Sequence, residues 1–358
     1  MLERDTSPCS EWYGEDVFDI LMSFVDKTMV WAIIVRIFTS KQCRWPAMGA
    51  YYLIQGGLFG SKVTGITIQG GRRVYRITAR EDLAPVTKLF KVEAPEVAHK
   101  AKAGQFVIVR VHERGERIPL TIADYDRESG EVTFVFQEVG KTTKHLGTLG
   151  VGHELASVTG PLGRPTEIEK YGTVVCVGGG VGIAPTYPIA RALREAGNTV
   201  VSIIGARNKS LLFWEDQMRA VSDELIVCTD DGSYARKALV TEPLKELLAS
   251  GRKVDIVWAI GPAIMMKFCT LTTQPFGVKT MVSLNSIMVD GTGMCGACRV
   301  EVGGKTRFVC VDGPEFDGHQ VDWNLLLERQ RIYLDQERRA QELFEAARGA
   351  SCESKEGR

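Results

Sequence analysis

Three cysteines and an aspartate in one glycine-rich stretch are the residues best suited to chemistry. Asp290, Cys295, Cys298 and Cys310 lie within DGTGMCGACRVEVGGKTRFVC. Their spacing follows the C-x4-C-x2-C pattern with a distant fourth ligand found in plant-type two-iron clusters, with an anionic oxygen ligand in the first position. The glycines between them allow tight turns around a bulky cluster. We predict a [2Fe–2S] cluster held by these four residues, and therefore transfer of single electrons.

Other arrangements of metal ligands are open on the same residues. One aspartate and three cysteines can hold a zinc ion tetrahedrally. Asp312 is a nearby substitute for Asp290, and Cys43 or Cys352 could supply a fourth ligand only if the chain folded back on itself.

A glycine-rich turn near the middle of the chain is the second chemical motif. An apolar strand expected at 173–177 leads directly into GGGVGIAP at 178–185, which opens a helical run. Backbone N–H groups and the helix dipole at such a turn can hold a pyrophosphate. The turn departs from the GxGxxG fingerprint, because Ile183 occupies the position of the third glycine. Its GxGxAP form resembles the nicotinamide domain of the ferredoxin–NADP reductase superfamily. The predicted contacts are Gly178, Gly179, Gly180, Gly182, Ala184 and Pro185.

Two further turns complete the predicted nicotinamide cleft. One follows the strand expected at 225–228 and the other follows the strand expected at 254–260. Ligands of open α/β sheets bind at the carboxyl ends of parallel strands, where both turns should lie. The aspartates of the first turn could instead only cap that turn. The predicted contacts are Asp230, Asp231, Gly232, Gly261 and Pro262.

The superfamily resemblance implies a flavin-binding barrel before the nicotinamide domain. RIPLT at 117–121 stands where the superfamily has R-x-Y-[ST], although it lacks the tyrosine and places Arg117 one residue further from Thr121. A guanidinium can bind a flavin phosphate bidentately. The turn GKTT at 140–143 would add a lysine charge and hydroxyl donors for the diphosphate. The implied contacts are Arg117, Pro119, Leu120, Thr121, Gly140, Lys141, Thr142 and Thr143.

The order of the expected elements agrees with this arrangement. Short β-rich runs with glycines between them, from residue 74 to 160, predict a small antiparallel barrel. Strands and helices then alternate, which predicts a parallel sheet with helices on both faces. The predicted domains are an uncertain N-terminal extension at 1–73, an FAD-binding β-barrel at 74–168, an NAD-binding α/β domain at 169–284, a [2Fe–2S]-binding segment at 285–325 and a helical tail at 326–358.

Composition and charge exclude several classes of function. The 358 residues allow two or three domains, and 44 basic against 44 acidic side chains argue against nucleic-acid binding by a general field. The apolar run 29–38 is far shorter than the ~20 residues that span a bilayer, and no basic segment of a secretory signal precedes it. We expect a cytoplasmic protein without membrane association. The extension is either poorly ordered or an arm that binds a partner or a membrane surface. We expect buried structural thiols at Cys176, Cys228 and Cys269.

A flavin barrel, a nicotinamide domain and a C-terminal two-iron segment, in this order, cover residues 74–320. This order resembles the electron-transfer subunit of dihydroorotate dehydrogenase. It is more similar to the small subunit of NADH-dependent reduced ferredoxin:NADP+ oxidoreductase, also called sulfide dehydrogenase beta subunit. Members of the second family have an aspartate at the position of Asp290 and a continuation like GPEFDGHQVDWNLLLERQRIY, here at 313–333.

The resemblance implies an electron-transfer subunit with FAD, NAD(H) and a [2Fe–2S] cluster, and with no general acid or base from the protein. It also implies a larger flavin and iron–sulfur partner of glutamate-synthase type, and ferredoxin as a substrate of the complex. Two alternatives stay open. One is the electron-transfer subunit of dihydroorotate dehydrogenase, and the other is a non-catalytic nucleotide-binding module with a structural zinc.

Overall fold

The computed structural model describes residues 68–69 and 72–356. The expectations for the N-terminal extension and its apolar run lie outside the described residues, except that β1 (Ile68–Gln69) and β2 (Arg72–Arg73) pair in an antiparallel ladder. Within the described part, no helix is both long enough and apolar enough to cross a bilayer.

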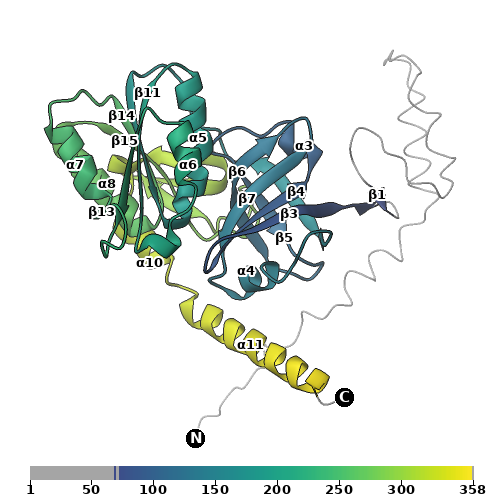
Figure 1. The fold of residues 1–358 in the computed structure, drawn as a ribbon. Coiled ribbons are helices and arrows are strands. Elements are labelled where there is room, and N and C mark those ends of the chain that lie inside the picture. The colour runs from purple at the N-terminus through teal and green to yellow at the C-terminus, as the bar shows by residue number, and fades with distance from the viewer. Residues whose placement is uncertain (1–67, 70–71, 357–358) are drawn as a thin grey trace, which may run out of the picture. The chain divides into compact units, whose positions relative to one another are not determined.

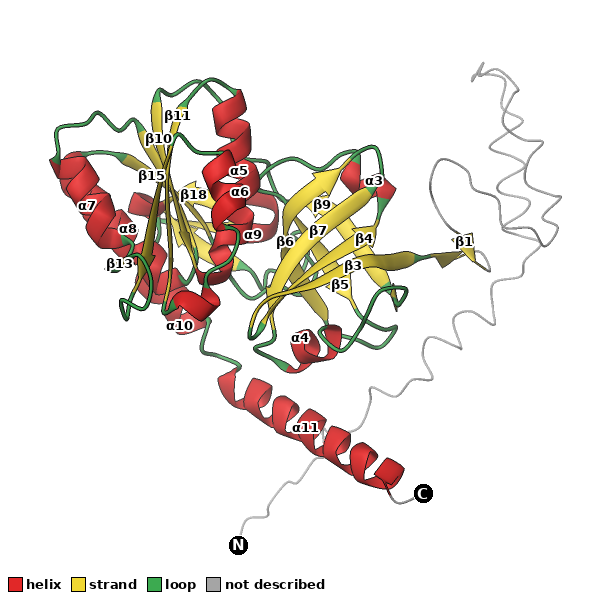
Figure 2. Cartoon of the chain, in the orientation of Figure 1, coloured by secondary structure: helices red, strands yellow, loops and turns green. Residues whose placement is uncertain are grey.

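An antiparallel sheet of seven strands forms the first half of the described chain (Figures 1 and 2). Its edge strands, β8 and β9, are joined by a single residue, so the two edges of the sheet are held together and it curls into a nearly closed barrel. In sheet order the strands are β8 (Glu154–Leu155), β3 (Tyr75–Ala84), β4 (Thr87–Glu93), β7 (Glu131–Gln137), β6 (Arg117–Asp126), β5 (Phe106–Arg110) and β9 (Ser157–Leu162). The short helices α3 (Pro95–Ala98) and α4 (Lys141–Leu146) lie in its connections.

The second half is built on a seven-stranded sheet of which six strands are parallel. In sheet order these are β13 (Arg236–Lys237), β12 (Glu224–Thr229), β11 (Thr199–Ala206), β10 (Thr173–Gly179), β14 (Ile256–Ile260) and β15 (Lys279–Ser283), and the antiparallel β18 (Glu315–Asp317) forms the far edge. Later strands are added on one side of β10 and then on the other, so the topological switch point lies between β10 and β14. Ligands of open α/β sheets bind outside the carboxyl ends of the strands at this point.

Helices cover both faces of this sheet, as the alternating pattern predicts. Buried side chains of α5 (Ile183–Glu195) and α6 (Glu215–Ala220) share one hydrophobic cluster with one face of β10. Those of α7 (Thr241–Ala249) and α8 (Ala263–Thr273) share another with the opposite face. The predicted fold class, a barrel followed by a parallel α/β sheet and a small C-terminal segment, is confirmed.

The C-terminal segment folds back on both halves. A loop leads from β15 into the hairpin β16 (Arg299–Val302) and β17 (Lys305–Phe308), then into α9 (Val309–Asp312), β18 and α10 (Trp323–Arg329). Phe106 and Ile108 of the barrel belong to the same hydrophobic cluster as Cys298 and Cys310 of this segment. The segment is therefore packed against the barrel as well as against the sheet.

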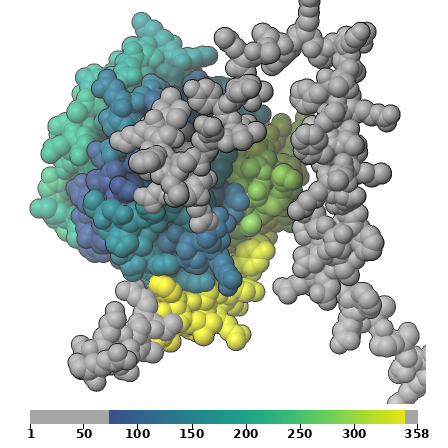
Figure 3. All heavy atoms as spheres, turned by 90° about the vertical axis from the view of Figure 1, so that its right-hand side faces the viewer, coloured from purple at the N-terminus to yellow at the C-terminus, as the bar shows by residue number. Residues whose placement is uncertain are grey.

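The helical tail is interrupted, although the sequence pattern continues through it. After α10 ends at Arg329, four residues form a turn before α11 (Leu334–Glu356) begins. The side chain of Gln330 donates to the backbone oxygen of Asn285 at 3.0 Å, while α11 contacts α4 through Lys144 and Glu345. Figure 3 shows the C-terminal residues against the barrel. The chain turns at 330–333 because the two helices dock on different elements.

Candidate functional site

Strand β6 brings the predicted flavin residues to the iron–sulfur loop. Arg117 begins the strand and is exposed, whereas the RIPLT residues that follow it are half-buried. The Nη2 atom of Arg117 donates to the backbone oxygen of Asp290 at 3.2 Å. One predicted flavin contact therefore touches one predicted cluster ligand.

The GKTT turn lies beside the start of β6, and Glu116 makes the contact between them. The sequence analysis did not single out this residue. Thr142 donates a short hydrogen bond to the Glu116 carboxylate, and the Lys141 ammonium lies 3.6 Å from it. Thr143 is used differently, because its hydroxyl accepts from the backbone N–H groups of Val139 and Gly140 and so caps α4. The structure thus brings the two predicted flavin motifs together, with the Glu116 carboxylate bound to the GKTT turn. Its position directly before Arg117 is the one signal in the sequence that could have drawn attention to Glu116.

The glycine-rich turn at 178–185 ends β10 and starts α5, as expected, but most of its glycines are required by packing. A Cβ at Gly179 would overlap the sulfur of Met265, and one at Gly182 would overlap the backbone oxygen of Ile260. Gly180 is different, because it has φ +56° and open space where a Cβ would lie. Close packing holds this turn against the one that follows β14, and Gly180 is the glycine of the turn that has open space beside it.

The Gly261–Pro262 turn meets the glycine-rich turn at the switch point. A Cβ on Gly261 would lie 3.0 Å from the backbone oxygen of Gly179. Pro262 is the N-cap of α8, with a φ of −55°. The two predicted nicotinamide turns are thus brought together, and Ala184 and Pro185 lie in the first turn of α5.

The aspartate turn lies further along the same edge of the sheet, two strands from β10. Burial raises the pKa of Asp230, and the nearby Arg207 opposes that shift. The Asp231 carboxylate accepts from the backbone N–H of Ser233 at 2.8 Å, and the side chain and then the backbone of Ser233 lower its pKa. Asp231 therefore stabilises its own turn, as the simpler interpretation of this motif expects. Gly232 follows with φ +77°.

The loop that carries Asp290, Cys295 and Cys298 lies on the outside of the barrel. Gly291 has φ +84°, and a Cβ there would lie 2.8 Å from Cγ1 of Ile108 and 3.0 Å from Cδ1 of Leu162. Only glycine allows this close approach in this backbone conformation. The barrel strands β5 and β9 therefore fix the start of the loop.

Two of the four predicted ligands are in contact, and the other two lie in the same loop. The sulfur atoms of Cys298 and Cys310 lie 3.2 Å apart and are buried, and burial raises the pKa of the Cys310 thiol to about 12. Cys295 is exposed, and the backbone N–H groups of Ala297 and Asp290 lower the pKa of its thiol. The Asp290 carboxylate accepts from the backbone N–H and the hydroxyl of Thr292, and the hydroxyl is the main cause of its lowered pKa.

Among the described residues, no group of three or more His, Cys, Asp or Glu side chains is placed to hold a metal ion. A two-iron cluster takes a separate pair of ligands for each iron atom. Cys298 and Cys310, whose sulfur atoms lie 3.2 Å apart, could supply one such pair, and thiolates are the ligands that iron–sulfur clusters use. A backbone N–H of Cys310 also points at the sulfur of Cys298, at 3.4 Å.

The alternative ligand Asp312 is already engaged. Its carboxylate accepts from the backbone N–H of Phe308 at 2.8 Å and lies 3.8 Å from the guanidinium of Arg164. Asp312 therefore holds the backbone around α9. Cys176, Cys228 and Cys269 are buried as predicted, and burial raises the pKa values of Cys176 and Cys269 to about 12.

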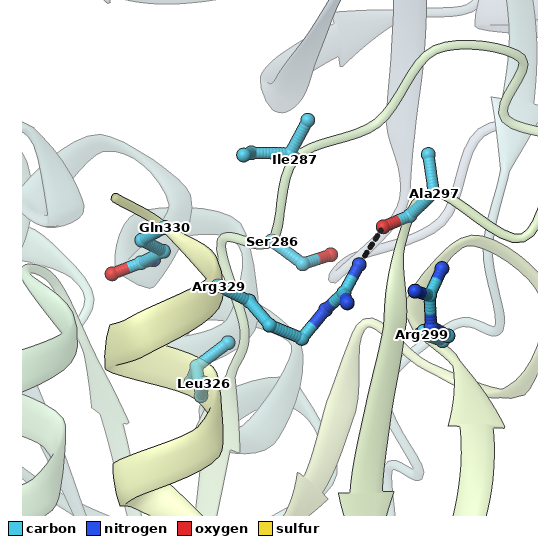
Figure 4. Close-up of a pocket in the computed structure, with 7 residues that line it drawn as sticks. All are labelled: Ser286, Ile287, Ala297, Arg299, Leu326, Arg329 and Gln330. Carbon is cyan, nitrogen blue, oxygen red and sulfur yellow. Dashed lines mark hydrogen bonds between the residues drawn. The ribbon is translucent and has the colours of Figure 1, made fainter. Parts of the chain in front are cut away.

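Helix α10 braces the loop from the other side. Figure 4 shows Arg329 reaching from α10 to the loop, where Nη2 donates to the backbone oxygen of Ala297 at 3.2 Å. The pocket that these residues line has a volume of about 10 Å³. That is enough for about one water molecule, and the buried hydroxyl of Ser286 faces it without a protein partner. The hydrogen bond from Arg329 to Ala297 joins distant positions of the chain, so no local sequence pattern reveals it.

A larger hollow of about 390 Å³ lies between the barrel and the helices α5 and α6. Its walls include Asp124 of β6, Tyr187 of α5 and Trp214, which precedes α6. None of the predicted cofactor residues lines it.

The architecture and the cysteine loop together define a ferredoxin reductase-like electron-transfer protein with an iron–sulfur domain. Residues 285–322 match the family described as the iron-sulfur cluster binding domain of dihydroorotate dehydrogenase B. The chain is 51% identical over 282 residues to a protein of Thermotoga maritima named "Dihydroorotate dehydrogenase B (NAD(+)), electron transfer subunit homolog", covering 79% of this chain and 99% of the relative. It is 35% identical to the electron transfer subunit of Shouchella clausii, over 64% of this chain and 90% of that protein.

A solved structure shows the same similarity. It is described as giving insights into flavin-based electron bifurcation via the NADH-dependent reduced ferredoxin-NADP oxidoreductase structure. It is 51% identical, has a TM-score of 0.73, and the match covers 77% of this chain and 99% of that one. The chain belongs to the family of dihydroorotate dehydrogenase B electron transfer subunits and their homologues. The resemblance predicted from the sequence is thereby confirmed, as are the predicted kinds of cofactor.

Proposed function

We propose that this chain passes electrons between NAD(H), FAD and a [2Fe–2S] cluster, in a complex that couples NADH, NADPH and ferredoxin. The observation that carries the proposal is the contact between β6 and the cysteine loop, where Arg117 binds the backbone of Asp290. This contact sets the predicted flavin strand beside the predicted cluster ligands. The 51% identity to a chain of the NADH-dependent reduced ferredoxin-NADP oxidoreductase structure supports the particular complex.

The residues of the chain would bind and orient the cofactors. FAD when bound exchanges a hydride with NADH and single electrons with the cluster. Arg117 and Lys141 would neutralise the flavin phosphates, and Thr121 with the backbone of β6 would orient the ring. Gly180 would let the dinucleotide approach the start of α5, where backbone N–H groups favour a pyrophosphate.

The cluster ligands would work in pairs, one pair for each iron atom. Asp290 and Cys295 lie on the exposed side of the loop, and Cys298 and Cys310 lie on the buried side. A carboxylate is a harder ligand than a thiolate, so the iron bound by Asp290 would differ electronically from the other. No side chain is assigned as a general acid or base.

A larger flavin and iron–sulfur subunit of glutamate-synthase type is the proposed partner, with ferredoxin acting through the complex. The apolar side chains Val289, Met294 and Val311 around the loop are 54%, 88% and 39% exposed. Exposed apolar side chains grouped in this way are typical of surfaces that a partner covers.

A second candidate is the electron transfer subunit of dihydroorotate dehydrogenase B itself. Relatives with that name are 32–35% identical, and the matching iron–sulfur family carries the name of the same enzyme. The two candidates share cofactors and differ in the partner and its substrate.

The test begins with anaerobic purification of the full chain and analysis of flavin, iron and acid-labile sulfide. We expect all three to be present, and a preparation without iron and sulfide would refute the proposal. The partner co-purified with the untruncated chain then separates the candidates. NADPH oxidation that requires both NAD+ and ferredoxin supports the first, whereas dihydroorotate-dependent reduction of NAD+ supports the second.

A further inference from the structure

Glu315 is a carboxylate at the junction of three parts of the chain. It begins β18, five residues after Cys310, and pairs with Ser283 at the edge of the parallel sheet. Burial is the main cause of the raised pKa of its carboxyl group, although the residue keeps some exposed surface. A carboxylate held in such surroundings needs hydrogen-bond donors.

Two buried side chains from different parts of the fold supply those donors. Thr166, in the connection between the barrel and the α/β sheet, donates its hydroxyl to Oε1 at 2.6 Å. Trp258, in the middle of β14, donates its indole N–H to Oε2 at 3.1 Å. Thr166 and Trp258 are 6% and 1% exposed. Glu315 thus joins the strand that follows Cys310 to both halves of the protein.

The barrel is shaped to leave room for this junction. Gly104 has φ +82°, and a Cβ there would overlap the hydroxyl of Thr166 and lie 2.9 Å from Oε1 of Glu315. The absence of a side chain at Gly104 therefore allows the carboxylate and the hydroxyl to meet beneath the barrel.

Backbone hydrogen bonds hold the same segment at neighbouring positions. Arg164 donates through its backbone N–H to the oxygen of Gly313 at 2.7 Å and through Nε to the oxygen of Val311 at 3.2 Å. The backbone N–H of Leu284 donates to the oxygen of Pro314 at 2.9 Å. Residues 311–315 are therefore held by the connection between the two halves on one side and by the chain after β15 on the other. The Glu315 side chain contacts both halves.

We propose that Glu315 is a positioning residue for electron transfer, which sets the Cys310 side of the cluster relative to the barrel that carries the predicted flavin strand. The proposal rests on the proposed function, because it concerns the distance and orientation between the two cofactors. Glu315 is not one of the predicted cofactor contacts, and it acts through Thr166 and Trp258. Its loss should disturb the step in which one electron leaves the reduced flavin and enters the cluster, while hydride transfer from NADH to the flavin continues.

The experiment uses the full chain with FAD and cluster bound, mixed with NADH in an anaerobic stopped-flow instrument. Flavin and cluster reduction are followed separately, and rates are compared per cluster that is visible by electron paramagnetic resonance. We expect Glu315→Ala to slow cluster reduction severalfold, because electron transfer between two centres slows as the distance between them grows. Flavin reduction by NADH should keep its wild-type rate. Glu315→Gln, which keeps an acceptor, should recover most of the rate.

The matched control is Glu301→Ala, which removes an exposed carboxylate from the same segment. If Glu315→Ala does not retain the cluster, the comparison is made with Thr166→Val, which removes one donor. If a variant that retains the cluster shows the wild-type rate of cluster reduction, the proposal for Glu315 is overturned. The proposed function is not affected by that result. A wild-type protein whose cluster NADH cannot reduce would overturn the proposed function instead.

Discussion

The Nη2 atom of Arg117 donates a hydrogen bond of 3.2 Å to the backbone oxygen of Asp290, across 173 positions of the sequence. The bond joins the first residue of β6 to the first predicted ligand of the cluster. Because the acceptor is a backbone atom, this bond does not occupy the Asp290 carboxylate, which accepts from Thr292 instead. The same guanidinium retains other N–H groups with which it can bind a phosphate.

Replacing Arg117 by alanine should weaken FAD binding. A hydrogen bond to a charged group contributes about 1.5–3 kcal/mol, so we expect the dissociation constant to rise about tenfold to a hundredfold. Fluorescence titration of flavin-free protein measures it. Arg114→Ala removes an exposed arginine of the same loop and serves as the control. An unchanged constant in the Arg117 variant would remove this residue from the flavin site.

Asp290→Ala should change the cluster because one iron atom loses its oxygen ligand. We expect a lower cluster content or an altered electron paramagnetic resonance spectrum and midpoint potential. Asp312→Asn is the control, since its carboxylate already binds the backbone of Phe308. Identical spectra and potentials for wild type and the Asp290 variant would show that another group ligates the iron.

Glu116→Gln should tighten FAD binding. The Glu116 carboxylate holds Thr142 and Lys141, which the diphosphate would otherwise engage, and adds a negative charge near it. Exposed ion pairs contribute about 0.2–1 kcal/mol, so the expected gain is up to about fivefold. The same titration measures it, with the exposed Glu128→Gln as control. Weaker binding in the Glu116 variant would mean that this carboxylate supports the site.

Gly180→Ala and Gly182→Ala should have different effects. At Gly182 the added Cβ overlaps the oxygen of Ile260, so we expect the turns after β10 and β14 to separate and stability to fall by about 3 kcal/mol or more. At Gly180 the space is open, and the cost is about 1–2 kcal/mol for a left-handed alanine. NADH affinity should fall in the Gly180 variant even where the protein remains folded. Denaturant unfolding and NADH titration test both variants, and equal stability losses would contradict the packing argument.

The pH dependence of stability should report on Glu315. Its pKa is raised in the folded protein, so ionisation costs more there than in the unfolded chain, and its contribution to stability is lost as pH rises through the folded pKa. Glu315→Gln cannot ionise, so its stability relative to wild type should increase from acidic to neutral pH. Denaturant midpoints at several pH values measure the difference. A difference that is constant with pH would show that the carboxyl group does not titrate in this range.

Local patterns sufficed to predict most strands of the barrel and of the parallel sheet, and the order of the two halves. The cysteine spacing and the glycine turn are local signals, because each motif lies within one turn or loop. The reasons for individual glycines were not predictable in the same way. Gly179 and Gly182 are fixed by Met265 and Ile260, which come about 80 positions later in the chain.

Contacts between distant segments account for what the sequence did not reveal. Glu116, Glu315 and Arg329 lie in ordinary polar patterns, and their roles follow from partners on other elements. The tail was expected to be one helical stretch because its pattern does not change at 330–333. The turn there follows from the docking of Gln330 on Asn285, which is a tertiary contact.

The close packing of Gly291 against Ile108 and Leu162 also bears on how the protein matures. The loop folds against the barrel strands β5 and β9, and both are synthesised well before Cys295, Cys298 and Cys310. Iron and sulfide delivered before those strands had formed would meet thiols with no surface to order them. Insertion of the inorganic centre should therefore be a late event in biogenesis, after the domains have folded.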